Sequence, residues 1–267
     1  VYPDDKFLEV PQKRIIEKKF LNSIGVPTAR WAAVGSPEQL EAAAESMGGG
    51  SFVLKTARFG YDGKGQLIHK TGQSVKRNFN RLKSEELILE EMIDFRCEIS
   101  VIVARDKSGK TAHYGPMLND HKNHRLWTST VPAPVESKIE TKARRIAGKL
   151  AREVNLRGVL GLEMFLTRDG RILANEIAPR THNSGHWTID ACYVSQFEQH
   201  VRTVCGLPIG NPARHSNAKM INLLGGDVNR VSKYYETKGA CIHIYGKRET
   251  RNGRKMGHVT LLKKLTP

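Results

Sequence analysis

The sequence predicts an α+β fold in which strands pair mostly antiparallel and helices are interspersed among them. Two short turn sequences, Lys107-Ser108-Gly109 and Asp169-Gly170, each lie between two strand-like segments. The second is a strong signal for the type I′ turn of a β-hairpin. The helical segments do not alternate regularly with strands, so a doubly wound parallel sheet is not expected.

The first 115 residues predict three helices and a series of short strands. Residues 11–24 carry an apolar stripe with helical spacing that Gly25 ends, and Ser36-Pro37 is typical of a helix start. We expect helices over residues 11–24, 36–48 and 74–82, and strands over residues 31–34, 51–56, 66–69 and 86–92.

The remaining residues predict two helices and a strand-rich end. The helix at 137–154 is long, basic and amphipathic. We expect helices over residues 137–154 and 194–205, and strands over residues 159–166, 171–177, 220–224, 241–245 and 258–262.

Composition limits the class of protein. The chain has 267 residues and a formal net charge of +16, which favours anionic partners such as nucleic acid, acidic lipid or phosphorylated metabolites. No apolar run approaches the roughly 18 residues that cross a bilayer, so an integral membrane protein is excluded. The four cysteines form no C-x-x-C pair, which argues against a zinc ribbon or a disulfide framework and favours the cytoplasm.

A glycine-rich loop, residues 60–66, follows a strand that carries Lys55. Its glycines allow successive backbone N–H groups to converge on an anion, and the Lys55 ammonium would reach the same phosphates. The loop lies between two strands and opens no helix, so it is not a Walker loop. It predicts a phosphate-binding flap, and the alternative is an ordinary hairpin turn.

Two glutamates face each other in the predicted second hairpin. With Asp169-Gly170 as a two-residue turn, Leu166 pairs with Leu173 and Glu163 falls opposite Glu176. Carboxylates about 5 Å apart repel each other unless a cation or a shared proton lies between them. Magnesium accepts carboxylate oxygens and keeps positions open for phosphates. The alternatives are that one Glu points to solvent or that Arg168 or Arg171 neutralises the pair.

Two further loops are rich in hydrogen-bonding groups. In residues 177–187, Arg180 could hold a small planar anion with two hydrogen bonds. His182 and His186 have an i, i+4 spacing that would suit zinc only on a helix, and the Ser184-Gly185 dipeptide makes a helix there unfavourable. Residues 253–258 combine two cations with two glycines and would suit a phosphate monoester, with a solvated basic turn as the alternative.

The order of these motifs resembles that of one enzyme family. The chain carries a strand lysine, GYDGKGQ, EEMI, an N-x-H, the paired glutamates, NEIAPRTHNSGHW, MINLLG and GRKMGH. Together they look like the N5-carboxyaminoimidazole ribonucleotide synthase family of ATP-grasp enzymes. The resemblance implies an ATP-grasp fold, two α+β subdomains that grip ATP, with a small and mostly β C-terminal portion. It also implies carboxylation of 5-aminoimidazole ribonucleotide by bicarbonate, driven by ATP through carboxyphosphate, in purine biosynthesis.

The resemblance also implies roles for individual residues, with ATP and Mg²⁺ as cofactors. Nucleotide contacts are implied for Arg14, Lys55, Gly60, Tyr61, Asp62, Gly63, Lys64, Gly65, Gln66, Glu90, Glu91, Met92, Ile93, Glu98, His121, Asn175 and Glu176. Catalytic roles near bicarbonate and the aminoimidazole are implied for Tyr61, Asp62, Lys64, Arg180, His182 and Asn183. The substrate phosphate is expected at Lys247, Arg254 and Lys255, and the metal at Glu163 and Glu176.

The same resemblance implies a domain division and two departures. We expect a helical part at 1–50, a lid at 51–115, a large subdomain with the metal site at 116–212 and a β-rich portion at 213–267. Family members begin with a nucleotide-fold domain that this chain is expected to lack, and they continue beyond GRKMGH. A homodimer is a further expectation.

Three other functions compete with this interpretation. One is another ATP-grasp ligase that forms an acyl phosphate, and another is a fragment that binds ATP without turnover. The third, a nucleic-acid-binding module, is not favoured because Trp31, Trp127 and Trp187 are not interleaved with one basic run.

Overall fold

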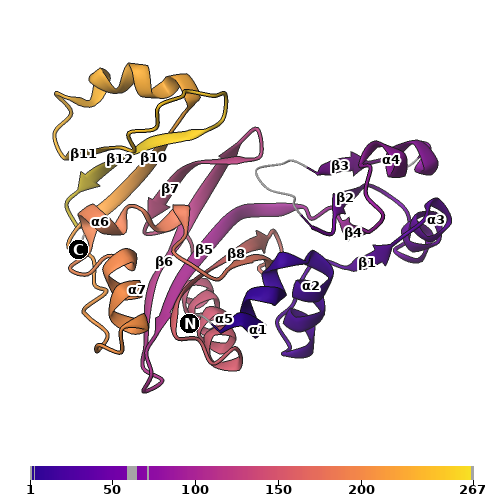
Figure 1. Cartoon of the computed structure of the whole chain (residues 1–267), viewed down its shortest axis with the longest axis horizontal. Helices are drawn as coiled ribbons and strands as arrows, with labels where there is room; N and C mark the ends of the chain where they lie inside the picture. The colour runs from indigo at the N-terminus through magenta and orange to yellow at the C-terminus, as the bar shows by residue number, and fades with distance from the viewer. Residues whose placement is uncertain (1, 3, 59–64, 71, 266–267) are drawn as a thin grey trace.

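The computed structural model describes residues 2, 4–58, 65–70 and 72–265. In this part of the chain the strands form two antiparallel sheets, and helices pack against both (Figure 1). The α+β prediction is therefore confirmed. The helices are α1 (Asp5–Glu9), α2 (Arg14–Ser23), α3 (Pro37–Ser46), α4 (Val75–Arg81), α5 (Ser137–Glu153), α6 (Thr188–Ala191) and α7 (Gln196–Val204), with 3₁₀ turns η1 (Val10–Gln12), η2 (Asn183–Gly185) and η3 (Gly225–Tyr234).

The small sheet has the strand order β1-β4-β2-β3 and lies at one end of the molecule (Figure 1). Its strands are β1 (Trp31–Val34), β2 (Phe52–Thr56), β3 (Gln66–His69) and β4 (Leu87–Glu91). Helix α3 begins as predicted, because the Ser36 side chain accepts a hydrogen bond from the backbone N–H of Gln39. Leu40 of α3 packs on Leu54 and Leu89 of the sheet in one buried cluster.

The large sheet has the order β11-β12-β10-β7-β6-β5-β8-β9 and runs through the middle of the molecule (Figure 1). Its strands are β5 (Phe95–Arg105), β6 (Thr111–Lys122), β7 (Arg125–Val131), β8 (Gly158–Thr167), β9 (Ile172–Ala178), β10 (Asn217–Leu224), β11 (Ala240–Ile244) and β12 (Lys255–Lys263). Alternate residues of β5 enter two different cores. Val101 and Val103 pack with α5, whereas Ile102 and Ala104 pack with Trp187 on the other face.

The second hairpin confirms the glutamate pairing but corrects its register. Glu163 pairs with Glu176 as predicted, whereas Leu166 pairs with Ile172 and not with Leu173. The backbone N–H of Thr167 bonds the carbonyl of Arg171, so the loop holds three residues and not two. A β-bulge between the Glu163 and Met164 pairs then restores the expected partners further along the strands.

Other sequence-based expectations need correction. The expected helix at 11–24 is interrupted at Lys13, which has an extended backbone, and the N–H of Arg14 bonds the carbonyl of Ala57. Strand β7 is absent from the expectations. Strand β1 joins the small sheet although it falls within 1–50, and β5 joins the large sheet although it falls within 51–115. The division of the chain into four parts, at 1–50, 51–115, 116–212 and 213–267, stays a prediction.

All four cysteines are free thiols. Among the described residues, no helix combines the length and the apolar character that crossing a membrane requires.

Candidate active site

A cavity of about 450 Å³ is lined by residues of both sheets and of helix α2. Sixteen of the residues singled out from the sequence line it: Arg14, Lys55, Gln66, Glu90, Glu91, Met92, Ile93, Glu98, His121, Glu163, Asn175, Glu176, Arg180, His182, Asn183 and Lys255. Sequence reasoning missed Glu17, Lys18, Ala29, Val53, Ile68, Phe95, His124, Leu126 and Phe165, which also line it. Segments far apart in the sequence therefore meet at one place.

Three charged side chains are buried together beside the small sheet. Lys55 Nζ lies 2.5 Å from Glu90 Oε2, and Lys18 Nζ lies 3.5 Å from Glu90 Oε1. Burial alone would raise the pKa of Glu90, but the two lysines lower it to about 2. Burial lowers the pKa of Lys55. With both lysines charged, one positive charge stays uncompensated and faces the cavity, which suits an anionic ligand.

Helix α2 brings two ionisable residues into the site that the sequence analysis does not single out. Lys18 donates to the carbonyl of Asn175 at 2.8 Å, and Glu17 Oε1 accepts from the N–H of Ile177 at 2.6 Å. Burial raises the pKa of Glu17 to about 8. The helical spacing of Arg14, Lys18 and Leu21 was an available signal, because it puts both cations on the face that Leu21 buries.

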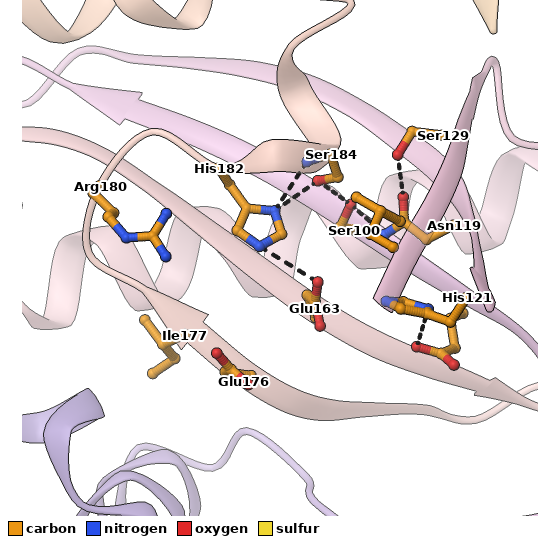
Figure 2. A network of polar contacts seen from close by, with 12 residues as sticks. Ser100, Asn119, His121, Ser129, Glu163, Glu176, Ile177, Arg180, His182 and Ser184 are labelled. Carbon is orange, nitrogen blue, oxygen red and sulfur yellow. Dashed lines mark hydrogen bonds and ion pairs between the residues drawn. The ribbon is translucent and has the colours of Figure 1, made fainter. Parts of the chain in front are cut away.

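The carboxylates of Glu163 and Glu176 occupy opposing positions on β8 and β9, facing the cavity (Figure 2). Glu163 Oε1 lies 3.4 Å from His182 Nε2, and Glu176 Oε2 lies 3.9 Å from an Arg14 nitrogen. Burial, and then the charge of Glu176, raises the pKa of Glu163 to about 7. Two facing carboxylates, with the pKa of Glu163 raised, fit the donor set that a hard divalent cation requires.

The alternative that Arg168 or Arg171 neutralises the pair is not observed. Arg168 pairs with Asp94 at 3.0 Å, and Arg171 pairs with Asp169 at 2.7 Å. Glu176 has a half-exposed side chain, but it lines the same cavity as Glu163.

Another part of the cavity is suited to a planar ring with a polar attachment. Phe95 and Phe165 stack there with their centroids 4.8 Å apart. Nearby, Glu98 Oε2 lies 3.1 Å from His121 Nδ1. Burial would lower the pKa of His121, but the hydrogen bond with Glu98 raises it.

The loop after β9 supplies three polar side chains to the cavity. Arg180 and His182 lie side by side in Figure 2, both above the glutamates. Burial, followed by the nearby charge of Arg180, lowers the pKa of His182 to about 3. Both polar atoms of the Asn183 side chain are buried and have no hydrogen-bond partner among the described residues. A buried amide in that state indicates a ligand site.

Several predicted residues lie away from the cavity or outside the description. Lys247 Nζ donates to the carbonyl of Lys255, and Arg254 donates to the carbonyl of Glu249, so these two side chains do not line the cavity. Gly65 pairs with Thr56 at the small sheet and also does not line it. Gly60, Tyr61, Asp62, Gly63 and Lys64 lie outside the described residues.

A second group of titratable side chains lies near β11 and β12. Asp190, His243 and His258 have ligand atoms within 4.8 Å of one another. However, His243 and His258 stack with an interplanar angle of 12° and a centroid distance of 4.4 Å. Nearly parallel rings cannot both direct an in-plane nitrogen lone pair at one ion. The geometry therefore favours a hydrogen-bonded stack over a metal centre.

Comparisons with known proteins identify the family. The model of the ATP-grasp domain matches residues 19–197, and that of the phosphoribosylaminoimidazole carboxylase C-terminal domain matches residues 218–266. An N5-carboxyaminoimidazole ribonucleotide synthase of Brucella melitensis is 47% identical over 268 residues, which cover 100% of this chain and 74% of the relative. The chain belongs to the N5-carboxyaminoimidazole ribonucleotide synthase family of ATP-grasp enzymes.

Solved structures of this family share the fold. One structure of an N5-carboxyaminoimidazole ribonucleotide synthetase, an ADP complex, is 41% identical with a TM-score of 0.91, covering 96% of this chain and 68% of that one. A second structure, from Aspergillus clavatus in complex with ADP and 5-aminoimidazole ribonucleotide, is 29% identical with a TM-score of 0.89. The match covers 96% of this chain and 69% of that one. The ATP-grasp fold expected from the sequence is confirmed.

Proposed function

We propose that this chain carboxylates the exocyclic amine of 5-aminoimidazole ribonucleotide with bicarbonate, at the expense of ATP, in purine biosynthesis. Membership of the synthase family supports the proposal, and one observation on the chain itself carries it. The cavity brings buried cations, a carboxylate pair and the Arg180–Asn183 loop to a single place. That combination serves a reaction in which phosphoryl transfer and carboxyl transfer must occur side by side.

ATP would lie between the two sheets. Lys18, Lys55 and Arg14 would bind its phosphates, because they supply positive charge on the small-sheet side of the cavity. Glu98 and His121 would hold the ribose, and residues 90–93 with the Phe95–Phe165 stack would contact the adenine. Residues 60–66 are proposed as the flap over the phosphates.

Magnesium would be held by Glu163 and Glu176. When bound, it supplies positive charge that neutralises the phosphates and favours phosphoryl transfer. The raised pKa of Glu163, at about 7, supports this assignment, because bringing a divalent cation to the pair would relieve the same repulsion that raises it.

Bicarbonate would bind at Arg180, His182 and Asn183. A bicarbonate oxygen attacks the γ-phosphorus of ATP, the bond to ADP breaks, and carboxyphosphate forms. The amine of the aminoimidazole then attacks the carboxyl carbon, inorganic phosphate leaves, and the amine loses a proton. Lys255 would bind the ribonucleotide phosphate together with Lys247 and Arg254, and Tyr61, Asp62 and Lys64 would contact the reacting groups.

Measurement of phosphate release tests this function. We expect release from ATP to require magnesium and to rise when bicarbonate and 5-aminoimidazole ribonucleotide are both present. Release stimulated by formate with another amine substrate would indicate a different ATP-grasp ligase. Nucleotide binding without any release would indicate an ATP-binding chain without turnover. A homodimer and a cytoplasmic location stay predictions.

A further inference from the structure

The ring of His182 contacts a backbone N–H, which can only donate, and the carboxyl group of Glu163. Its Nδ1 lies 3.3 Å from the backbone nitrogen of Ser184, and its Nε2 lies 3.4 Å from Glu163 Oε1. A backbone N–H can only donate, so Nδ1 must accept. In the neutral ring the single proton then lies on Nε2, the nitrogen that faces the Glu163 oxygen.

This tautomer fixes the direction of a chain of buried hydrogen bonds (Figure 2). Ser184 Oγ lies 2.9 Å from Nδ1 and must donate to it, so Ser184 accepts from Ser100 at 2.8 Å. Since the Ser100 proton is used there, Ser100 accepts from the amide of Asn119, also at 2.8 Å. Asn119 Oδ1 finally accepts from Ser129 at 2.8 Å.

This row of hydrogen-bonded side chains is shielded from water. Ser100, Ser129 and Ser184 have no exposed surface, and Asn119 is 4% exposed. Water therefore does not compete for these groups, and breaking one bond leaves a buried partner unsatisfied. The direction of each bond is transmitted to the next, from Ser129 to the imidazole.

The backbone of His182 is held as well. Gln196 accepts from its N–H at 2.9 Å and donates to its carbonyl at 2.7 Å. On the opposite side, a Cβ at Gly161 would lie 2.7 Å from the His182 Cβ. The side chain therefore leaves the backbone at a fixed place, and the hydrogen-bonded chain decides how the ring is turned.

We propose that Ser184, Ser100, Asn119 and Ser129 are positioning residues that hold His182 as the Nε2–H tautomer and direct this N–H into the cavity. The importance of this for turnover rests on the proposed function, in which His182 donates to an anionic carboxylating substrate. The competing interpretation is that the four side chains only satisfy one another and support the fold.

Ring-nitrogen NMR on histidine-labelled full-length chain tests the tautomer without any reference to activity. The His182 signals are assigned by their loss in His182→Gln, and all spectra are recorded at one fixed pH. We expect the parent to show a single Nε2–H tautomer, and Ser184→Ala and Ser100→Ala to show broadened or mixed tautomer signals. Thr128→Val is the control, because Thr128 is a buried hydroxyl next to Ser129 that bonds Asp120 and not this chain. An Nδ1–H tautomer in the parent would overturn the proposal.

Kinetics test whether the positioning serves the reaction. We expect Ser184→Ala and Ser100→Ala to lower kcat/KM for bicarbonate by about 3- to 10-fold, the value of one hydrogen bond, and Ser129→Ala to have a smaller effect of the same sign. KM for ATP should not change, and Thr128→Val should match the parent. Ring signals that match the parent in Ser184→Ala and Ser100→Ala, together with parental kinetics in all three serine variants, would overturn the proposal. Altered ring signals with unchanged kinetics would support the positioning and count against the proposed role of His182.

Discussion

On the small-sheet side of the cavity, charge is buried against charge, whereas behind His182 neutral hydroxyl and amide groups are buried in series. We refer to Lys18, Lys55 and Glu90 as the ionic wall, and to Ser100, Asn119, Ser129 and Ser184, which reach the cavity through His182, as the neutral wall. In the ionic wall one carboxylate serves two ammonium groups. In the neutral wall each side chain donates one hydrogen bond along the row and accepts one from it, except Ser129 at the far end, which only donates.

The two walls provide different properties to a ligand. The ionic wall supplies a net charge, which attracts an anion but offers little directional preference because an ammonium is a point charge. The neutral wall supplies no charge but a fixed direction for one N–H. A site that must hold a polyphosphate and orient a small anion benefits from having both.

The largest effect on stability is expected in the ionic wall. Glu90→Gln leaves Lys18 and Lys55 buried without a carboxylate, and removing one partner of a buried ion pair costs about 3 to 5 kcal/mol. Urea denaturation measures this free energy of unfolding. Glu91→Gln is the control, because Glu91 pairs with Arg30 in a more exposed position. Equal stability of the two variants would contradict the buried ionic wall.

The second prediction concerns the carboxylate pair between the walls. Glu176→Gln is isosteric but removes one proposed magnesium ligand, so phosphate release should fall by about 100-fold or more, equivalent to about 2.7 kcal/mol of barrier. Glu136→Gln is the control, because the side chains of Glu136 and Glu176 are both 53% exposed. Parental turnover of Glu176→Gln at limiting magnesium would remove Glu176 from the metal site.

The third prediction is that Glu17 makes the free energy of unfolding depend on pH. Its pKa is about 8 in the folded chain and ordinarily 4.5, so its contribution to stability is complete below 4.5 and is lost as the pH rises towards 8. Between about pH 6 and 7.5 the parent should lose about 2 kcal/mol more than Glu17→Gln, at roughly 1.4 kcal/mol per pH unit. Gln keeps the oxygen that accepts from Ile177. Parallel stability curves, measured by urea denaturation at several pH values, would show that Glu17 ionises normally.

The smallest effect is expected at the far end of the neutral wall. Ser129→Ala removes one uncharged donor to Asn119, and an uncharged hydrogen bond contributes about 0.5 to 1.5 kcal/mol. Thermal unfolding of Ser129→Ala and Thr128→Val, compared with the parent, measures it. A loss as large as that of Glu90→Gln would erase the difference between the walls.

Local patterns were sufficient to predict most elements and one half of the site. The Ser36 cap, the hairpin glutamates and the strand position of Lys55 all follow from spacing within short segments. Strand β7 and the placement of β5 in the large sheet depend on pairing between distant segments, which spacing does not encode.

The burial of ionisable side chains is the main feature that the sequence did not predict. Lys18 and Glu17 look like ordinary polar positions of an amphipathic helix, and only the carboxylate of Glu90 and the backbone of β9 make their burial tolerable. The family resemblance groups Lys247, Arg254 and Lys255 at the substrate phosphate. Only Lys255, the first residue of β12, lines the cavity.

The bulge at Asn175 has a consequence for how many ligands one strand can offer. In a regular strand neighbouring residues face opposite sides, so a hairpin presents one donor per strand at each level. Here Asn175 and Glu176, which are adjacent in sequence, both line the cavity opposite the single residue Glu163. The extra residue therefore raises the local density of oxygen donors without lengthening the hairpin. A chain shortened by this one residue would keep the two glutamates opposite each other but would lose the third oxygen-bearing side chain, and with it the carbonyl that now holds Lys18.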